Sequence, residues 1–174
     1  MANFDIAVEH LIKLEGGYRQ QDAHGAGAVK FGITALFAVR NGLATKRTVE
    51  EYIRSLTPDK AKALYKQYYW DKYKLGEFKS TGVASALLSF IVNANVKHIV
   101  LTIQRACNKA SIALGARSSI AEDGILGPAT IRTINLWMDN QERCRVFLKI
   151  WRDELCRVYE DKGRKLPKIA KGLM

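Results

Sequence analysis

A largely apolar stretch from Thr81 to Val96 constrains the fold of this chain more than any other part of its sequence. Its apolar side chains do not keep to one stripe, so the stretch predicts a helix that is apolar on nearly all sides: Val83, Ala84, Ala86, Leu87, Leu88, Phe90, Ile91 and Val92. Such a helix is stable only when other elements cover it. We therefore expect a domain built around this helix as its buried centre.

Other segments repeat apolar side chains with the helical period of about 3.6 residues. Residues 3–14 predict a first helix that Asn3 caps and the pair Gly16-Gly17 ends. Further helices are predicted over 34–39, 48–54, 57–70 and 97–114, after Pro128, and beyond Asp139, whose side chain is expected to cap the last helix while Glu142 reaches back. Residues 18–33 predict a loop with a short hairpin through Ala28–Ile33. The sequence thus predicts a mainly α helical bundle forming one domain, 1–174.

The formal net charge of +11 indicates an anionic partner: nucleic acid, anionic lipid or an acidic cell-wall polymer. No apolar run reaches the roughly 18 residues of a membrane span, so we expect no stable membrane insertion. The cysteines are odd in number and lack a CxxC spacing, which predicts free, buried or partly buried thiols at Cys107, Cys144 and Cys156. The three histidines are scattered, and we expect no metal and no cofactor.

One carboxylate, Glu15, lies at the predicted end of the first helix, beside a polar, glycine-rich loop. A carboxyl group at the edge of such a loop is well placed to donate a proton to a glycosidic oxygen, and Asp22 in the loop is the nearest downstream carboxylate. On spacing alone, Glu15 fits a solvated helix-end residue better than a general acid, because glutamates at helix ends are common, and Asp22 is equally expected as a group that binds local turn amides. From these residues alone both interpretations stay open.

Aromatic residues are concentrated between the predicted helix over 57–70 and the buried helix: Tyr65, Tyr68, Tyr69, Trp70 and Tyr73. They could stack on sugar rings or form core. Asn93 lies on the apolar helix and needs a partner if it is buried. It could bind a sugar N-acetyl group or a loop backbone.

Three motifs, in this order, resemble the glycoside hydrolase family 108 lysozymes, a group of N-acetylmuramidases that includes phage endolysins. The first is Glu15-Gly16-Gly17-Tyr18, followed by Asp22 and by Phe31-Gly32-Ile33-Thr34. The second is the apolar Leu87-Leu88-Ser89-Phe90-Ile91-Val92-Asn93. The third runs from Asp123 to Thr130 and is similar to the DGxxGPxT motif of the family's C-terminal peptidoglycan-binding region.

The resemblance implies a lysozyme-like α+β fold and cleavage of the bond between N-acetylmuramic acid and N-acetylglucosamine. Glu15 matches the family's catalytic glutamate, and Asp22 is the candidate to stabilise positive charge or orient water. We expect Tyr18, Thr34, Tyr69, Trp70 and Asn93 to bind substrate. About 1–95 would form the catalytic part, and about 96–174 a helical part resembling a peptidoglycan-binding region.

The chain departs from the family pattern in the loop after the first helix. This loop is two residues longer than usual, and Val29 stands where a threonine is expected. If that threonine positions a water, this chain must use another group, and Thr34 and His24 are the candidates. Ser89 also stands where many members have aspartate, and Asn95 replaces a frequent glycine.

We expect a monomeric phage or prophage endolysin that acts on bacterial peptidoglycan within an anionic cell envelope. The N-terminus lacks the basic and apolar regions of a secretory signal, which predicts synthesis in the host cytoplasm and action in the periplasm or cell wall after holin-type release. A lytic transglycosylase, which needs one carboxylate and no activated water, and a non-catalytic cell-wall-binding protein stay open as alternatives. A nucleic-acid binder has only the charge in its favour, because no recognition-helix signature is present, so we expect no nucleic-acid partner.

Overall fold

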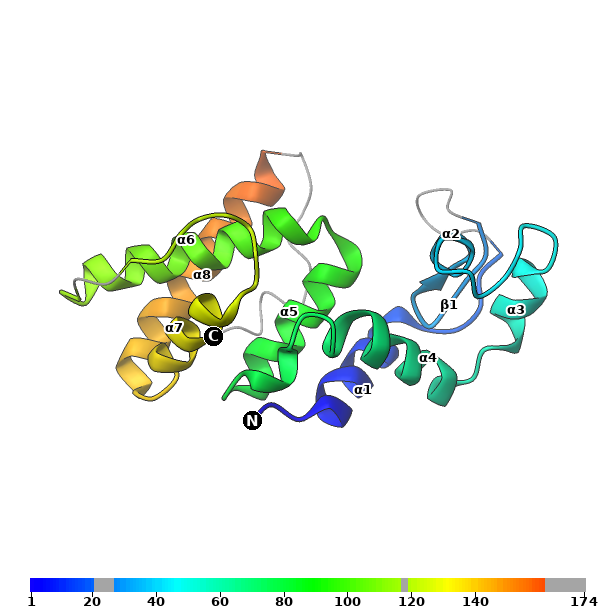
Figure 1. The fold of residues 1–174 in the computed structure, drawn as a ribbon, viewed down its shortest axis with the longest axis horizontal. Coiled ribbons are helices and arrows are strands. Elements are labelled where there is room, and N and C mark those ends of the chain that lie inside the picture. Colours follow the sequence, from blue (N-terminus) through cyan, green and yellow to red (C-terminus); the bar gives the residue numbers. More distant parts are fainter. Residues whose placement is uncertain (21–26, 117–118, 162–174) are drawn as a thin grey trace.

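The computed structural model describes residues 1–20, 27–116 and 119–161. It is an elongated helical molecule, with the β-hairpin, α2 and α3 at one end and α6, α7 and α8 at the other (Figure 1). Its α-helices are α1 (Phe4–Glu15), α2 (Ala35–Arg40), α3 (Val49–Ser55), α4 (Pro58–Tyr65), α5 (Thr81–Asn93), α6 (Val96–Ala113), α7 (Pro128–Trp137) and α8 (Gln141–Glu160). No helix in these ranges combines the length and apolar character needed to cross a bilayer.

A small antiparallel hairpin follows the first helix, as predicted. Strands β1 (Val29–Lys30) and β2 (Ile33–Thr34) pair Val29 with Thr34 and Lys30 with Ile33. The Lys30 ammonium donates to the Arg54 carbonyl oxygen at 2.7 Å and so ties the hairpin to α3. Together with the helices, this hairpin confirms the predicted mainly α, lysozyme-like fold class.

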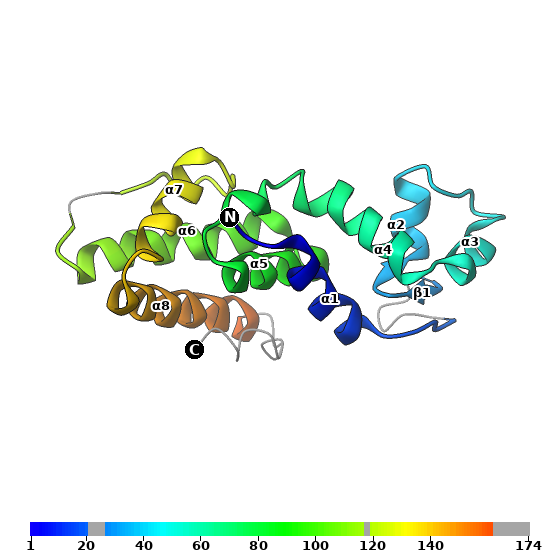
Figure 2. The same ribbon diagram turned by 90° about the horizontal axis from the view of Figure 1, so that it is seen from below.

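Helix α5 lies at the centre, where it packs against α1, α6 and the short elements η1 (Lys66–Trp70) and η2 (Leu75–Glu77) (Figures 1 and 2). Its apolar side chains are buried, as predicted, except that Val92 is only partly buried. It ends at Asn93, however, and not at Val96. Asn95 is the N-cap of α6, accepting from the His98 amide at 3.3 Å, so a separate helix begins there.

Three other helices have their caps at the first residue of the predicted ranges 3–14, 34–39 and 57–70, which are Asn3, Thr34 and Thr57. At α8 the prediction is wrong by one residue. Asn140 is the cap, because its Oδ1 accepts from the amides of Glu142 at 2.9 Å and Arg143 at 3.1 Å. Asp139 instead forms an ion pair with Lys79 at 2.5 Å.

Side chains from α1 through α8 form one connected apolar core. In the C-terminal half of the chain, α6 packs along α8. There the indole of the buried Trp151 donates to Thr102 Oγ1 at 3.1 Å. The buried carboxylate of Glu154 is paired with Lys109 at 2.5 Å and with Arg157 at 3.2 Å. The three cysteines are free, with Cys107 buried and the other two partly buried, as predicted.

The segment Asp123–Thr130 folds around the buried side chain of Gln104 on α6. The Gln104 amide nitrogen donates to Asp123 Oδ1 at 2.8 Å and to Thr130 Oγ1 at 3.2 Å, and its oxygen accepts from the Gly124 amide at 2.8 Å. The hydrogen bond from Gln104 is the main reason that the pKa of Asp123 lies below its usual value. The polar groups of this motif therefore fix α7 against α6.

Candidate active site

Glu15 is the last residue of α1, where its side chain is half-buried. The next residue, Gly16, ends the helix with φ of +70°, a conformation that glycine adopts without steric cost. The Gly16 carbonyl oxygen accepts from the Phe31 amide at 3.0 Å. This bond brings the turn of the β-hairpin back beside the end of α1, so Glu15 lies between the helix and the hairpin.

The amide of Asn93 contacts Glu15 from the end of the central helix. Asn93 Nδ2 donates to Glu15 Oε1 at 3.0 Å and to the Ser89 carbonyl oxygen at 3.2 Å. The sequence predicted either a sugar group or a loop backbone as the partner of Asn93. In the structure its partner is the candidate acid, Glu15. This hydrogen bond from the last residue of the central helix restricts the orientation of the carboxyl group.

The turn of the hairpin approaches Glu15 so closely that only glycine fits. Gly32 has φ of +76°, and a β-carbon placed there would lie 2.9 Å from Glu15 Cγ and closer still to the Tyr65 hydroxyl. That hydroxyl donates to the Phe31 carbonyl oxygen at 2.8 Å. Burial, and next the charge of Glu15, raise the pKa of Tyr65 well above its ordinary value, so the hydroxyl stays a donor.

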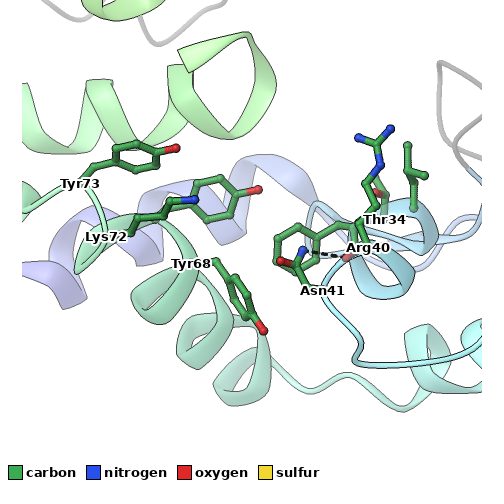
Figure 3. A pocket seen from close by; sticks show the side chains of 9 residues that line it. Thr34, Arg40, Asn41, Tyr68, Lys72 and Tyr73 are labelled. Atoms are coloured by element: carbon green, nitrogen blue, oxygen red, sulfur yellow. Dashed lines mark hydrogen bonds between the residues drawn. The ribbon is translucent and has the colours of Figure 1, made fainter. Parts of the chain in front are cut away.

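A pocket of about 310 Å³ is lined in part by Tyr69, a neighbour of Tyr65, and we call it the tyrosine pocket. Its walls are α2 with Thr34 on one side and η1 with the turn after it on the other (Figure 3). The lining residues are Thr34, Leu36, Phe37, Arg40, Asn41, Tyr68, Tyr69, Lys72 and Tyr73.

Tyr69 connects the tyrosine pocket with the surroundings of Glu15. Its ring lies 5.9 Å from the ring of Tyr65 and stacks on Phe37 at 6.0 Å between centroids. Burial raises the pKa of Tyr69 to about 12, so its hydroxyl is neutral at physiological pH. The half-buried phenol rings offer flat apolar faces and polar edges, which suits a sugar or another amphipathic ligand.

The predicted site residues fall into separate groups. Glu15 and Asn93 are hydrogen-bonded, and Thr34 and Tyr69 line the tyrosine pocket. Tyr18 instead donates to Glu50 Oε1 at 3.3 Å and lies under the Arg54 guanidinium, 4.3 Å from its ring centroid. Asp22 and His24 lie outside the described residues.

Trp70, predicted to bind substrate, lies in the core. It is 5% exposed and packs edge-on against Phe4 at 5.3 Å. Its ring therefore has no open face for a sugar. The reason is the π-helical turn η1, closed by the bond from the Asp71 amide to the Lys66 carbonyl at 2.9 Å, which rotates Trp70 inward relative to Tyr69.

Several pocket residues were not predicted: Leu36, Phe37, Arg40, Asn41 and Lys72. The sequence around Arg40 and Asn41 resembles an ordinary helix end, and Lys72 resembles an ordinary surface charge. The usable signal was the position of Lys72 inside the aromatic cluster.

Val29 is 3% exposed, so its side chain belongs to the core and cannot take over the role of a polar threonine. Within the described ranges, no group of three or more His, Cys, Asp or Glu residues is arranged to hold a metal ion.

The family model described as Glycosyl hydrolase 108 matches residues 8–94, half of the chain and the part that carries Glu15, the hairpin, the tyrosine pocket and Asn93. The chain belongs to glycosyl hydrolase family 108. It is therefore a glycoside hydrolase, and its site must be explained as one that cleaves a glycosidic bond. Residues after 94, including the segment Asp123–Thr130, lie outside the family match.

Among solved structures, the chain is similar to SagA of Brucella abortus, with a TM-score of 0.60 and 22% sequence identity. The similarity covers 92% of this chain and 86% of that one, so it extends over the C-terminal helices as well. At this identity it supports the fold alone. A comparison with curated proteins found no match.

Proposed function

We propose that this glycoside hydrolase is an N-acetylmuramidase of peptidoglycan, with Glu15 as its general acid. The observation that carries the proposal is the enclosure of Glu15 by the hairpin turn, the Tyr65 hydroxyl and the Asn93 amide, within the part of the chain that matches the family. In this mechanism Glu15 gives its proton to the glycosidic oxygen as the bond to the leaving sugar breaks.

The arrangement around Glu15 supports this role. Its described neighbours supply donors and a closely packed backbone, and such contacts limit the rotamers of the side chain. A fixed acid loses less entropy in the transition state than a mobile one. We assign Asp22 to the second role, stabilising the developing positive charge or orienting water. Thr34 is the alternative for the water, although its Oγ1 already accepts from the Phe37 amide at 3.1 Å.

The biological role that we propose is that of a phage or prophage endolysin. It would be made in the host cytoplasm and reach the cell wall after holin-type release. The charge of +11 favours attraction to an anionic envelope, and added salt would weaken that attraction. We propose residues up to about 95 as the catalytic part and those from about 96 as the helical part that contributes wall binding.

The replacement Glu15→Gln tests the proposal on purified peptidoglycan, because glutamine keeps the shape of the side chain and cannot donate the proton. We expect the clearing of a wall suspension to slow by about a hundredfold to ten thousandfold, the usual contribution of a general acid. The matched control is Glu9→Gln on the same helix, whose exposed carboxylate contacts only Lys13 among the described residues, at 3.3 Å. Wild-type clearing by Glu15→Gln would refute the assignment.

A further inference from the structure

The tyrosine pocket has two cationic side chains and no acidic one among the described residues that line it. Arg40 comes from the end of α2, and Lys72 comes from the turn after η1 on the opposite side (Figure 3). Both are exposed, so their charges lie where a bound molecule could reach them. The pocket is therefore electropositive within its own walls, independently of the net charge of the chain.

Neither cation is neutralised by a carboxylate in the described part of the chain. Asp71, the acidic residue next to Lys72 in the sequence, already forms an ion pair with Lys66 at 2.7 Å. Lys72 lies over the ring of Tyr73, with its ammonium 5.5 Å from the centroid. Arg40 and Lys72 thus keep their capacity to bind an anion, and the fork of Arg40 is suited to a planar carboxylate.

The remaining lining groups fit a carboxylate that is attached to a sugar. Tyr68, Tyr69 and Tyr73 line the same pocket as the two cations. Because Tyr69 remains protonated up to high pH, it can donate to an anionic oxygen. The aromatic faces beside it would cover the apolar side of a sugar ring or a peptide.

Tyr69 links the pocket to the surroundings of the candidate acid. Tyr69 contacts Tyr65, whose hydroxyl lies at the hairpin turn beside Glu15. A glycan that is cleaved at Glu15 and continues along Tyr69 would bring one of its units to the pocket that holds the two cations. In peptidoglycan every second sugar carries a lactyl group, which ends in a free carboxylate or continues into a peptide stem with its own carboxylates.

We propose that Arg40 and Lys72 form a carboxylate-binding subsite in the tyrosine pocket, which recognises the carboxylates that distinguish peptidoglycan from a neutral glycan. The inference rests on the proposed function, because it takes peptidoglycan as the ligand. Beyond that function, it names Arg40 and Lys72 as the side chains that select peptidoglycan. The free lactyl carboxylate and the stem carboxylates share one chemistry, and the experiment separates them.

The test measures the affinity of the full-length chain carrying Glu15→Gln for three soluble probes. These are glycan strands with peptide stems, strands stripped by an amidase so that lactyl carboxylates are exposed, and stripped strands whose carboxylates have been reduced to alcohols. Arg40→Gln and Lys72→Gln are each introduced into this chain. The matched control is Lys46→Gln with Arg47→Gln, which removes two exposed charges from the loop after α2, outside the pocket.

We expect each pocket replacement to weaken binding of a carboxylated probe by about tenfold, the scale of one lost charge-assisted hydrogen bond. The reduced strands should bind weakly to all variants alike. A loss confined to stem-bearing strands assigns the stem carboxylates, and a loss with stripped strands assigns the lactyl carboxylate.

Three results would overturn the subsite: equal affinity of the parent chain for reduced and carboxylated strands, an equal loss in the Lys46/Arg47 control, or no binding of any strand by the folded chain. The measurement uses a chain that is not expected to cut, so it is independent of the lysis assay. If the wild-type chain fails to hydrolyse peptidoglycan while the pocket variants still lose affinity, only the proposed activity fails.

Discussion

The replacement Gly32→Ala tests whether the hairpin turn positions Glu15. An alanine at φ of +76° is strained, at a cost of roughly 1–2 kcal/mol. Its β-carbon would also lie 2.9 Å from Glu15 Cγ, whereas unstrained carbon contacts are about 3.5–4.0 Å. Glu15 and the Tyr65 hydroxyl must therefore move by about half an ångström or more, or the turn must move away from them.

These two costs predict separate effects on stability and on activity. Overpacking adds roughly 1–3 kcal/mol to the backbone strain, so we expect a loss of about 2–5 kcal/mol in the free energy of unfolding. Displacement of the acid should lower the rate of wall clearing by about tenfold to a hundredfold at temperatures where the variant is folded, since a shift of about 1 Å can cost a hundredfold.

Gly42→Ala is the matched control. Gly42 has φ of +68°, yet a β-carbon there would meet nothing within 4 Å. It should carry the backbone strain alone, with a loss of roughly 1–2 kcal/mol and wild-type clearing. Urea unfolding and clearing of a wall suspension measure both quantities. If Gly32→Ala and Gly42→Ala behave alike in the two assays, the turn does not position Glu15.

Three further predictions concern other contacts. Asn93→Ala removes a donor to Glu15, so clearing should slow by about tenfold, and an unchanged rate would refute the positioning role. Gln104→Ala leaves Asp123 and Thr130 without their buried partner, so urea unfolding should show a loss of about 2–4 kcal/mol; a loss below about 1 kcal/mol would contradict this. The folded pKa of Tyr69, about 12, lies above its unfolded value of 10.0, so the stability it contributes is full below pH 10 and is lost as the pH rises toward 12. The free energy of unfolding of Tyr69→Phe should therefore fall less steeply between pH 10 and 12 than that of the wild type. Equal slopes would refute the raised pKa of Tyr69.

Local chemistry made most of the fold predictable from the sequence. A cap such as Thr34 or Thr57 binds an amide three residues away, so the information lies within one turn. The same logic fails where two good caps are adjacent. Asp139 and Asn140 both suit the start of α8, and the ion pair of Asp139 with Lys79, 60 residues earlier in the chain, accompanies the choice of Asn140.

The site was predictable only as far as local signals reach. Glu15 at the end of a helix, followed by glycines, could be identified from sequence neighbours and from the family motif. Its partner Asn93 is 78 residues away, and only packing of α1 against α5 brings the two together. The aromatic cluster was visible, but the π-helical turn decides that Tyr69 faces the pocket and Trp70 the core. A periodicity of about 3.6 residues does not anticipate that rotation.

The proposed role of Glu15 is to donate a proton as the bond between N-acetylmuramic acid and N-acetylglucosamine is hydrolysed. The products of digestion test this role most directly. Purified peptidoglycan is digested with the wild-type chain and with Glu15→Gln, and the released fragments are analysed by mass spectrometry after reduction of their ends. We predict fragments that end in reducible N-acetylmuramic acid from the wild type and almost none from Glu15→Gln. Anhydromuramyl ends would identify a lytic transglycosylase, and equal release by both chains would contradict the role of Glu15.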